Sequence, residues 1–362
     1  MNIVFRVDSS DIIGTGHVYR CLNFANQYKE HNISFICKNH NYNLNSKISE
    51  NYKLYELSLD NYKNINLDMN TWLGESQIDD LNKTIDIIKD NNLVIDWLII
   101  DHYAINKIWE DSIKEYVKNI CVIDDFTNRE HNCNIILNQQ ISQEEGIIKY
   151  KNIINSDCKI YCGNDYLLLH PKYFNYINFE KKYENYIKRI NIFMGGSDIH
   201  NISENIIDIC NYYNKNIKNK IIYDVIIGKS NKNYIKIKNK LKDLDNFNLY
   251  YDLEFIGNLL EKADLSIGAP GSTSYERVLM KVPCLSICIA ENQKTVINKF
   301  IEANVMKYLG TIEDKYKEKL IEYLNYFNKN INELKKISIN CENFINLKNN
   351  KLKFILYKIY FI

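Results

Sequence analysis

Four short stretches carry residues whose types and spacing suit chemistry on a phosphorylated compound. Each follows an apolar run and precedes a helical pattern: GTGH at 14–17, DHY at 101–103, MGGSD at 194–198 and GAPGSTSYE at 268–276. Small residues there expose backbone N–H groups near the positive end of a helix dipole, which binds phosphate. One glycine-rich turn alone is also common for steric reasons. Two such turns together, Gly195-Gly196-Ser197 and Gly271-Ser272-Thr273, favour a diphosphate site.

His17 is the residue in these turns best suited to acid–base chemistry. It follows Gly14, Thr15 and Gly16 where a helix should start, and a helix dipole disfavours the imidazolium form at that end. A neutral imidazole at pH 7 can serve as a general base, which contributes about 10²–10⁴ in rate. A structural histidine packed against the first strand is the alternative.

Glu276 lies about one helical turn after the last glycine-rich turn. Its carboxylate could accept hydrogen bonds from both hydroxyls of a ribose, as acidic residues do in dinucleotide-binding folds. Thr273 and Glu276 also have the spacing of a capping box, in which the two side chains bond the first amides of a helix. The sequence leaves both interpretations open.

The composition is that of a globular protein large enough for two domains, with 362 residues, 46% hydrophobic and 25% charged. The formal net charge of +1 gives no global attraction for nucleic acid or anionic membrane. We find no signal-peptide pattern and no apolar run long enough to span a membrane, so a cytoplasmic location is expected. The ten cysteines lack zinc-ligand spacing, which predicts reduced, mostly buried thiols and no metal site.

Apolar runs alternate with helical patterns almost from end to end, which is typical of βαβ units and parallel sheets. The rhythm restarts after a polar stretch rich in Tyr and Lys. The sequence therefore predicts an α/β protein with two Rossmann-like, doubly wound parallel-sheet domains that face a cleft. The expected boundaries are 1–171, a linker at 172–188, and 189–362 with a helical tail, whose final FILYKIYFI is expected to be a strand or a docked helix end.

The motifs also follow one another as in a known family. RVDSSDIIGTGHVYRCLNFA, IIDHYAI, WE, VIDDFTNREHNCNIILNQ, MGGSD, GSTSYER and ENQ occur in this order. In this the chain resembles the UDP-2,4-diacetamido-2,4,6-trideoxy-β-L-altropyranose hydrolases of pseudaminic acid biosynthesis, also labelled spore coat polysaccharide biosynthesis proteins of the SpsG type. The resemblance implies a MurG-like GT-B fold, UDP on the C-terminal domain and the sugar facing the N-terminal loops.

The reaction that the resemblance implies is hydrolysis at the anomeric carbon, with C1–O cleavage, inversion and loss of UDP, and without a metal or other cofactor. His17 matches the family's proton acceptor, and Tyr103 and Asn292 match residues that line its active site. The expected sugar-binding set also includes Asp8, Gly14, Thr15, Gly16, Asp101, Asn138 and Gln293. Gly195, Gly196, Ser197, Gly271, Ser272, Thr273 and Glu276 are the expected UDP-binding residues.

Two other activities fit the same predicted fold. A GT-B glycosyltransferase would hold the same UDP-sugar and transfer the sugar to an acceptor hydroxyl, and a binding protein would hold it without turnover. The N-terminal half shows no basic or apolar helix face obvious enough for a lipid acceptor, and the intact GTGH turn argues against a non-catalytic role. We therefore expect a monomeric hydrolase with a UDP-sugar as its partner and no nucleic acid or membrane partner.

Overall fold

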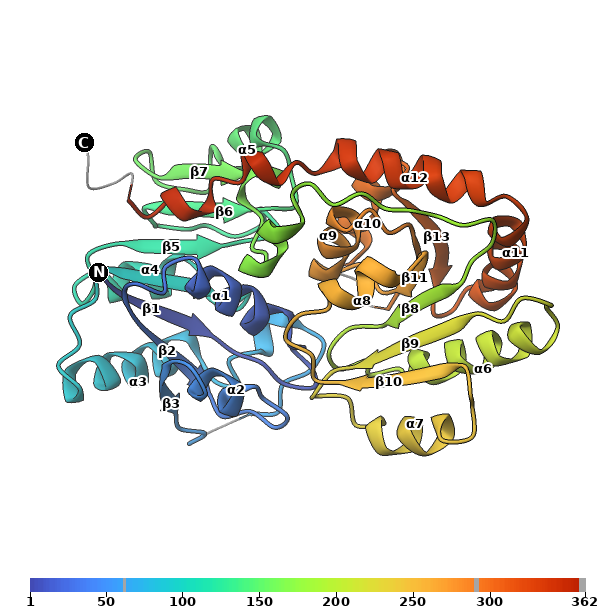
Figure 1. Cartoon of the computed structure of the whole chain (residues 1–362). Helices are drawn as coiled ribbons and strands as arrows, with labels where there is room; N and C mark the ends of the chain where they lie inside the picture. The colour runs from blue at the N-terminus through green and yellow to red at the C-terminus, as the bar shows by residue number, and fades with distance from the viewer. Residues whose placement is uncertain (61–62, 290–292, 358–362) are drawn as a thin grey trace. The chain divides into compact units, whose positions relative to one another are not determined.

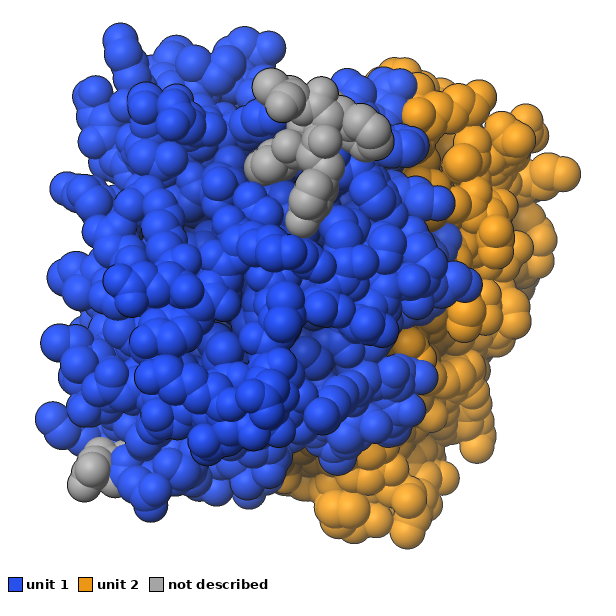
Figure 2. Space-filling view, turned by 90° about the vertical axis from the view of Figure 1, so that its left-hand side faces the viewer, with its two compact units in different colours: residues 1–171, 349–362 blue, residues 172–348 orange. Residues whose placement is uncertain are grey.

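The computed structural model describes residues 1–60, 63–289 and 293–357 of the chain (Figure 1). It divides into two compact units, Met1–Pro171 with Asn349–Ile362, and Lys172–Lys348. Figure 2 colours the two units separately. The division differs from the expected boundaries at two places, because 172–188 belongs to the second unit and the C-terminal segment belongs to the first.

The first unit is built on a parallel sheet of seven strands among the described residues, in the order β3-β2-β1-β4-β5-β6-β7. The strands are β1 (Asn2–Val7), β2 (Asn32–Lys38), β3 (Lys53–Leu57), β4 (Trp97–Asp101), β5 (Ile120–Ile123), β6 (Ile135–Asn138) and β7 (Lys159–Cys162). The α-helices are α1 (Gly16–Asn26), α2 (Asn45–Ser49), α3 (Gln77–Asp90), α4 (Lys107–Ile113) and α5 (Gln143–Tyr150). This is a doubly wound order, and its direction reverses between β1 and β4.

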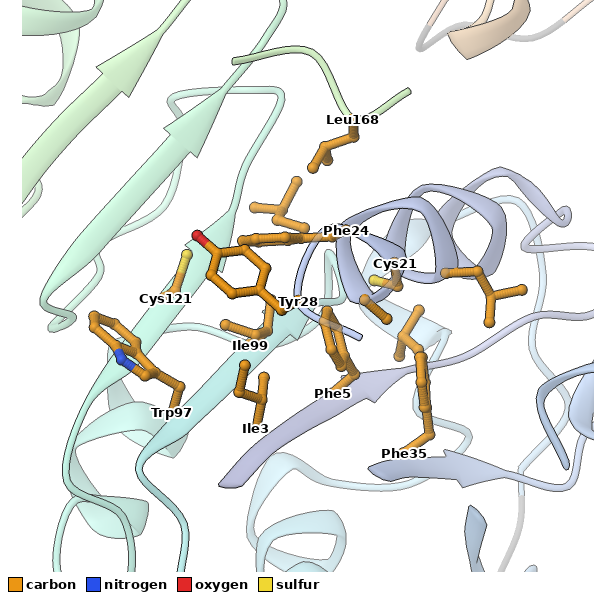
Figure 3. Packing of buried hydrophobic residues seen from close by; sticks show 14 of the residues in the cluster. Ile3, Phe5, Cys21, Phe24, Tyr28, Phe35, Trp97, Ile99, Cys121 and Leu168 are labelled. Carbon is orange, nitrogen blue, oxygen red and sulfur yellow. The ribbon is translucent and has the colours of Figure 1, made fainter. Parts of the chain in front are cut away.

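Side chains on both faces of this sheet are buried, because they alternate between two cores along each strand. Ile3 and Phe5 of β1 belong to one core, while Val4 between them belongs to the other. Figure 3 shows the first core, in which Phe5 stacks on Phe35 with ring centroids 4.8 Å apart and Phe24 lies against Phe5. Helix α1 supplies Phe24, so this core fixes the helix that follows β1.

The C-terminal segment completes the same core. Leu352, Ile355 and Leu356 are buried among its residues, and the hydroxyl of Tyr28 donates a hydrogen bond to the carbonyl of Leu352 at 3.0 Å. The segment forms a short 3₁₀ helix, η5 (Leu352–Phe354), rather than a strand. Within the stretch expected to be a strand or a docked helix end, Phe354 ends η5 and residues 355–357 form a turn, while 358–362 lie outside the described residues.

The second unit repeats the same order on a parallel sheet of six described strands, β10-β9-β8-β11-β12-β13, which reverses between β8 and β11. The strands are β8 (Arg189–Phe193), β9 (Ile222–Ile227), β10 (Phe247–Tyr251), β11 (Leu265–Gly268), β12 (Cys284–Cys288) and β13 (Met306–Thr311). The helices are α6 (Ile202–Lys215), α7 (Tyr234–Leu241), α8 (Gly257–Lys262), α9 (Ser272–Leu279), α10 (Gln293–Glu302), α11 (Tyr316–Lys329) and α12 (Ile331–Phe344). The predicted class, two doubly wound parallel α/β sheets, is confirmed.

All ten cysteines lie among the described residues, where they are free thiols, and only Cys158 is not fully buried. The prediction of mostly buried thiols is confirmed. The part of the chain that the structure describes holds no group of three His, Cys, Asp or Glu side chains placed as metal ligands. Helices long and apolar enough to cross a bilayer are likewise absent from that part.

Candidate active site

The GTGH and DHY motifs meet at the reversal point of the first sheet. GTGH lies in the connection from β1 to α1, and DHY begins at Asp101, the last residue of β4. Strands β1 and β4 are neighbours, with Val7 opposite Asp101. Open parallel sheets bind ligands outside the carboxyl ends of the strands at such a point.

The loop before α1 is tight and leaves open space beside His17. Gly14 has φ +83°, a left-handed conformation that glycine adopts without strain, and its N–H donates to the carbonyl of Ser10 at 2.9 Å. Helix α1 has Thr15 as N-cap residue but no side-chain cap. A Cβ at Gly16 would meet none of the described atoms within 4 Å. Backbone amides at this helix start are therefore accessible to a ligand.

His17 is held from one side by a carboxylate and packed by two aromatic rings. Its Nδ1 lies 2.7 Å from Oδ1 of Asp101. The ring is 4.5 Å from that of Tyr103 and 5.8 Å from that of Trp72, measured between centroids, and both contacts are edge-to-face. Since the carboxylate accepts a hydrogen bond from Nδ1–H, Nε2 is the nitrogen that can take a proton. The residue is 8% exposed, so it is buried but not sealed from solvent.

Arg20 binds the same carboxylate as His17. Its Nε and Nη2 donate to the two oxygens of Asp101, each at 2.6 Å, and its Nη1 donates to Asp125 at 2.6 Å. The hydroxyl of Tyr103 donates to the same oxygen of Asp125. Burial by itself would raise the pKa of Asp101, but the Arg20 guanidinium and His17 outweigh it and hold that pKa well below its usual value. The Asp101 side chain is therefore a carboxylate at any physiological pH.

Three of the predicted sugar-binding residues have side chains that are buried in the first unit and bonded to other protein groups. Both oxygens of Asp101 are taken by His17 and Arg20, and its side chain is fully buried. Asp8 is also fully buried and bonds Arg6 at 2.6 Å. Asn138 is buried and donates to the hydroxyl of Tyr150 at 2.9 Å. The structure corrects the prediction for all three: a position near a strand end does not determine whether a side chain faces the ligand or the interior.

The remaining members of that set are placed differently. Gly16 is exposed, and Thr15 is buried beneath it. Asn292 lies outside the described residues. Gln293 begins α10 in the second unit, where its Oε1 accepts a hydrogen bond from the N–H of Ile289 at 2.9 Å. Gln293 therefore has a local structural role, and its contact with a sugar stays a prediction.

The glycine-rich turns of the second unit occupy the equivalent point of the second sheet. One follows β8 and the other follows β11, and these strands pair with Phe193 opposite Gly268. Gly195 has φ +93°, and a Cβ at Gly195 or Gly271 would meet no described atom within 4 Å. Helix α9 starts at Ser272 with Gly271 as N-cap residue and no side-chain cap. An uncapped helix start with open space above it is suited to an anion.

Helix α6 does not offer its N-terminus in the same way. The carboxylate of Asp198 accepts hydrogen bonds from the N–H groups of Ile202 and Ser203 at 2.8 and 2.9 Å. The first amides of α6 are therefore bound by an acidic side chain of the protein, and the expected contact of Gly195, Gly196 and Ser197 with UDP stays a prediction. Only the backbone of the turn itself is left for a ligand.

Glu276 is not part of a capping box. Gly271 is the N-cap residue of α9, so Thr273 is already inside the helix. Burial raises the pKa of Glu276 to about 7. The next residue, Arg277, donates to the carbonyls of Ala269 and Phe193, both at 2.9 Å. It thereby ties the end of β11 to the end of β8 and fixes the spacing of the two glycine-rich turns.

Sequence reasoning did not single out Arg20, Asp125 or Arg277. A signal for Arg20 was available, because residues three apart on a helix share a face and Arg20 is three residues after His17. Asp125 and Arg277 had no local signal. Their partners Arg20 and Phe193 lie 105 and 84 residues away in the sequence.

Two doubly wound parallel sheets, each carrying small-residue loops at its reversal point, define a protein of the GT-B type. MurG of Acinetobacter baumannii has a similar structure, with a TM-score of 0.62, 10% sequence identity and coverage of 100% of both chains. The sequence is 32% identical over 302 residues to the UDP-2,4-diacetamido-2,4,6-trideoxy-β-L-altropyranose hydrolase of Campylobacter jejuni, covering 82% of this chain and 94% of that relative. The chain belongs to the family of that hydrolase, as the motifs predicted.

A second relative supports the same family. The sequence is 24% identical over 170 residues to the spore coat polysaccharide biosynthesis protein SpsG of Bacillus subtilis, covering 46% of this chain and 48% of that protein. No family model matches the chain.

Proposed function

We propose that this protein hydrolyses a UDP-sugar, UDP-2,4-diacetamido-2,4,6-trideoxy-β-L-altropyranose, to UDP and the free sugar. The observation that carries the proposal is the 32% identity to the Campylobacter jejuni hydrolase, which extends over 94% of that relative. The His17–Asp101 pair at the reversal point of the first sheet supports it, because hydrolysis requires a base that activates water.

In the proposed reaction His17 acts as the general base. The oxygen of a water molecule bonds C1 of the sugar while the C1–O bond to UDP breaks, and UDP leaves with the bonding electrons. Nε2 of His17 takes the proton of the attacking water, and Asp101 at Nδ1 stabilises the imidazolium that forms. Attack on the face opposite UDP inverts the configuration at C1.

The nucleotide is proposed to bind the second unit. The uncapped start of α9 and the turn at Gly195–Ser197 would donate backbone N–H groups to the diphosphate, which stabilises its charge as the bond breaks. Glu276 would accept hydrogen bonds from the ribose hydroxyls. Arg277 would keep the two turns in register without touching the nucleotide.

Incubation of the protein with this UDP-sugar in H₂¹⁸O, with no acceptor present, tests the proposal. We expect UDP and free sugar as products, with ¹⁸O on C1 of the sugar and none in UDP. Label in UDP would show P–O cleavage and contradict the mechanism. UDP release only after an acceptor is added would identify a glycosyltransferase, and binding without turnover would identify a binding protein. The gluco isomer, assayed in parallel, measures the preference for the altro configuration.

A further inference from the structure

The carboxylate that holds His17 is shared with a permanent cation. Asp101 contacts Nδ1 of His17 through Oδ1, and Arg20 donates to both oxygens of that carboxylate. The Nη2 atom of Arg20 is also 3.3 Å from Nδ1 of His17. Because a guanidinium keeps its charge at every accessible pH, Arg20 offsets part of the negative charge that Asp101 presents to His17.

This compensation matters because a general base has to be unprotonated before the reaction. A carboxylate beside an imidazole favours the imidazolium form, which cannot take a proton from water. A cation that binds the same carboxylate, close to the ring, has the opposite effect. Arg20 is therefore placed to limit the influence of Asp101 on His17 while leaving the hydrogen bond at Nδ1 intact.

The other groups around the ring do not carry a competing charge. Burial raises the pKa of Tyr103 and of Cys21 well above the usual values, so both side chains are neutral. Trp72 is uncharged. Asp125 is the second anion of the cluster, and it binds Arg20 rather than His17.

Beyond this layer the charges are paired. Arg129 lies over the ring of Tyr103 at 5.4 Å and donates to Asp124 at 2.6 Å. Asp101, Arg20 and Asp125 are therefore the charged side chains that contact His17 directly or through one shared partner.

We propose that Arg20 is a positioning residue that weakens the stabilisation of the His17 imidazolium by Asp101, because both side chains share that carboxylate, and that Asp125 opposes this effect by drawing on the charge of Arg20. The catalytic consequence rests on the proposed hydrolase function. The charge balance itself does not, because it is a property of the protein without substrate.

Titration of the His17 imidazole by NMR, on the full chain without substrate, tests the charge balance directly. His17→Asn identifies the His17 signal among the seven histidines. We expect Arg20→Gln to raise the midpoint of this titration by about one pH unit, which is a tenfold change in the protonation equilibrium. Arg20→Lys keeps the positive charge, and its midpoint should stay close to that of the parent.

The matched control is Arg189→Gln, which removes a guanidinium bonded to Asp224 in the second unit and should leave the midpoint unchanged. A folded Arg20→Gln protein with an unchanged or lower midpoint would overturn the proposal. If Arg20→Gln does not fold, Asp125→Asn provides the test. In that variant Arg20 is bonded to the carboxylate of Asp101 alone, so the midpoint of the His17 titration should fall. An unchanged or raised midpoint would contradict the proposal.

The pH–rate profile for UDP release extends the test to catalysis. In Arg20→Gln the limb on the acid side should move to higher pH by the same amount as the NMR midpoint. Activity should then be about tenfold lower on that limb and recover as the pH rises. A merely structural role for Arg20 predicts a uniform loss at every pH. If the parent releases no UDP at all, the proposed function fails, while the NMR midpoints still decide on Arg20.

Discussion

His17 is the residue on which the proposed chemistry depends most directly. Replacing it with Asn keeps a side chain that can donate to Asp101 but removes the basic nitrogen. We expect kcat for UDP release to fall by about 10²–10⁴, because that is the contribution of a general base. UDP affinity, measured by calorimetry, should barely change, since the nucleotide is proposed to bind the second unit.

The control for this variant is His200→Gln, a substitution of an exposed histidine, which should leave kcat unchanged. A folded His17→Asn protein that keeps near-parental kcat would reduce His17 to a packing residue. So would a variant whose defect is confined to nucleotide binding.

Glu276 gives a prediction about pH, because burial raises its pKa to about 7. As the pH rises through that value the carboxyl group loses its proton and becomes a stronger hydrogen-bond acceptor for a ribose. A charge-assisted bond is worth about 1 kcal/mol more than a neutral one, or about fivefold in affinity. Relative to Glu276→Gln, the parent should therefore bind UDP about fivefold more tightly one pH unit above that value, with the advantage lost one unit below it.

The affinity has to be compared with that of Glu276→Gln, because UDP has its own titrating phosphate. The effect of that phosphate on the affinity is the same for both proteins and cancels in the comparison. Glu322→Gln, an exposed substitution in the same unit, should follow the parent at every pH. Equal UDP affinities of the parent and Glu276→Gln across the whole range would exclude contact between this carboxylate and the ribose.

The sequence located the loops of the candidate site better than it assigned the side chains in them. GTGH could be identified because glycine, threonine and histidine at a strand end already restrict the chemistry. Asp101 was assigned to the sugar because its distance from His17, 84 residues along the chain, concealed their contact at 2.7 Å. Helix-dipole reasoning about His17 was incomplete, since it left out the Asp101 carboxylate and the Arg20 guanidinium, which lie 2.7 and 3.3 Å from Nδ1.

At the scale of single elements, the start of α6 depends on Asp198. Asn201 is the N-cap residue of α6, but the Asp198 carboxylate accepts from two amides in the first turn of the helix. Asp198→Ala should therefore lower the free energy of unfolding by about 0.5–2 kcal/mol, the usual cost of losing a side chain that satisfies such amides. Urea denaturation followed by circular dichroism measures the change. Burial raises the pKa of Asp198, so pH 8 keeps the parent side chain ionised during the measurement.

A substitution at Asp208, within α6, provides the comparison for the change in unfolding free energy. Asp208 is exposed and pairs with Lys240 at the surface, and such pairs contribute about 0–1 kcal/mol. Asp208→Ala should therefore have the smaller effect. If Asp198→Ala unfolds at the same urea concentration as the parent, the capping contact contributes nothing measurable and the amides are satisfied in another way.

The helices and strands themselves were largely predictable from the sequence, whereas the order of the strands in each sheet was not. Ser76 and Asn106 are the N-cap residues of α3 and α4, and their side chains accept hydrogen bonds from helix amides, so both helix starts have a local signal in the sequence. Strand order depends on contacts between distant segments. The adjacency of β1 and β4, which joins GTGH to DHY, therefore emerges only from the three-dimensional structure.

At the scale of the whole molecule, the two ends of the chain belong to the same unit. The C-terminal residues were expected in the second domain because sequence order was the only guide, yet they pack into the core that α1 also contacts. The Tyr28–Leu352 hydrogen bond spans 324 positions of sequence. Leu352, Ile355 and Leu356 therefore complete the core of the first unit.

This arrangement predicts that a substitution in the C-terminal segment destabilises the first unit. Leu356 is fully buried in its core, so Leu356→Ala should cost about 2–5 kcal/mol of unfolding free energy through lost burial and the cavity that remains. Phe354, in the same segment, is 55% exposed, and Phe354→Ala should cost less than about 0.5 kcal/mol. All three tryptophans, Trp72, Trp97 and Trp109, lie in the first unit, so fluorescence during urea denaturation reports the unfolding of that unit alone. If Leu356→Ala and Phe354→Ala show the tryptophan transition at the same urea concentration, the C-terminal segment does not stabilise this core in solution.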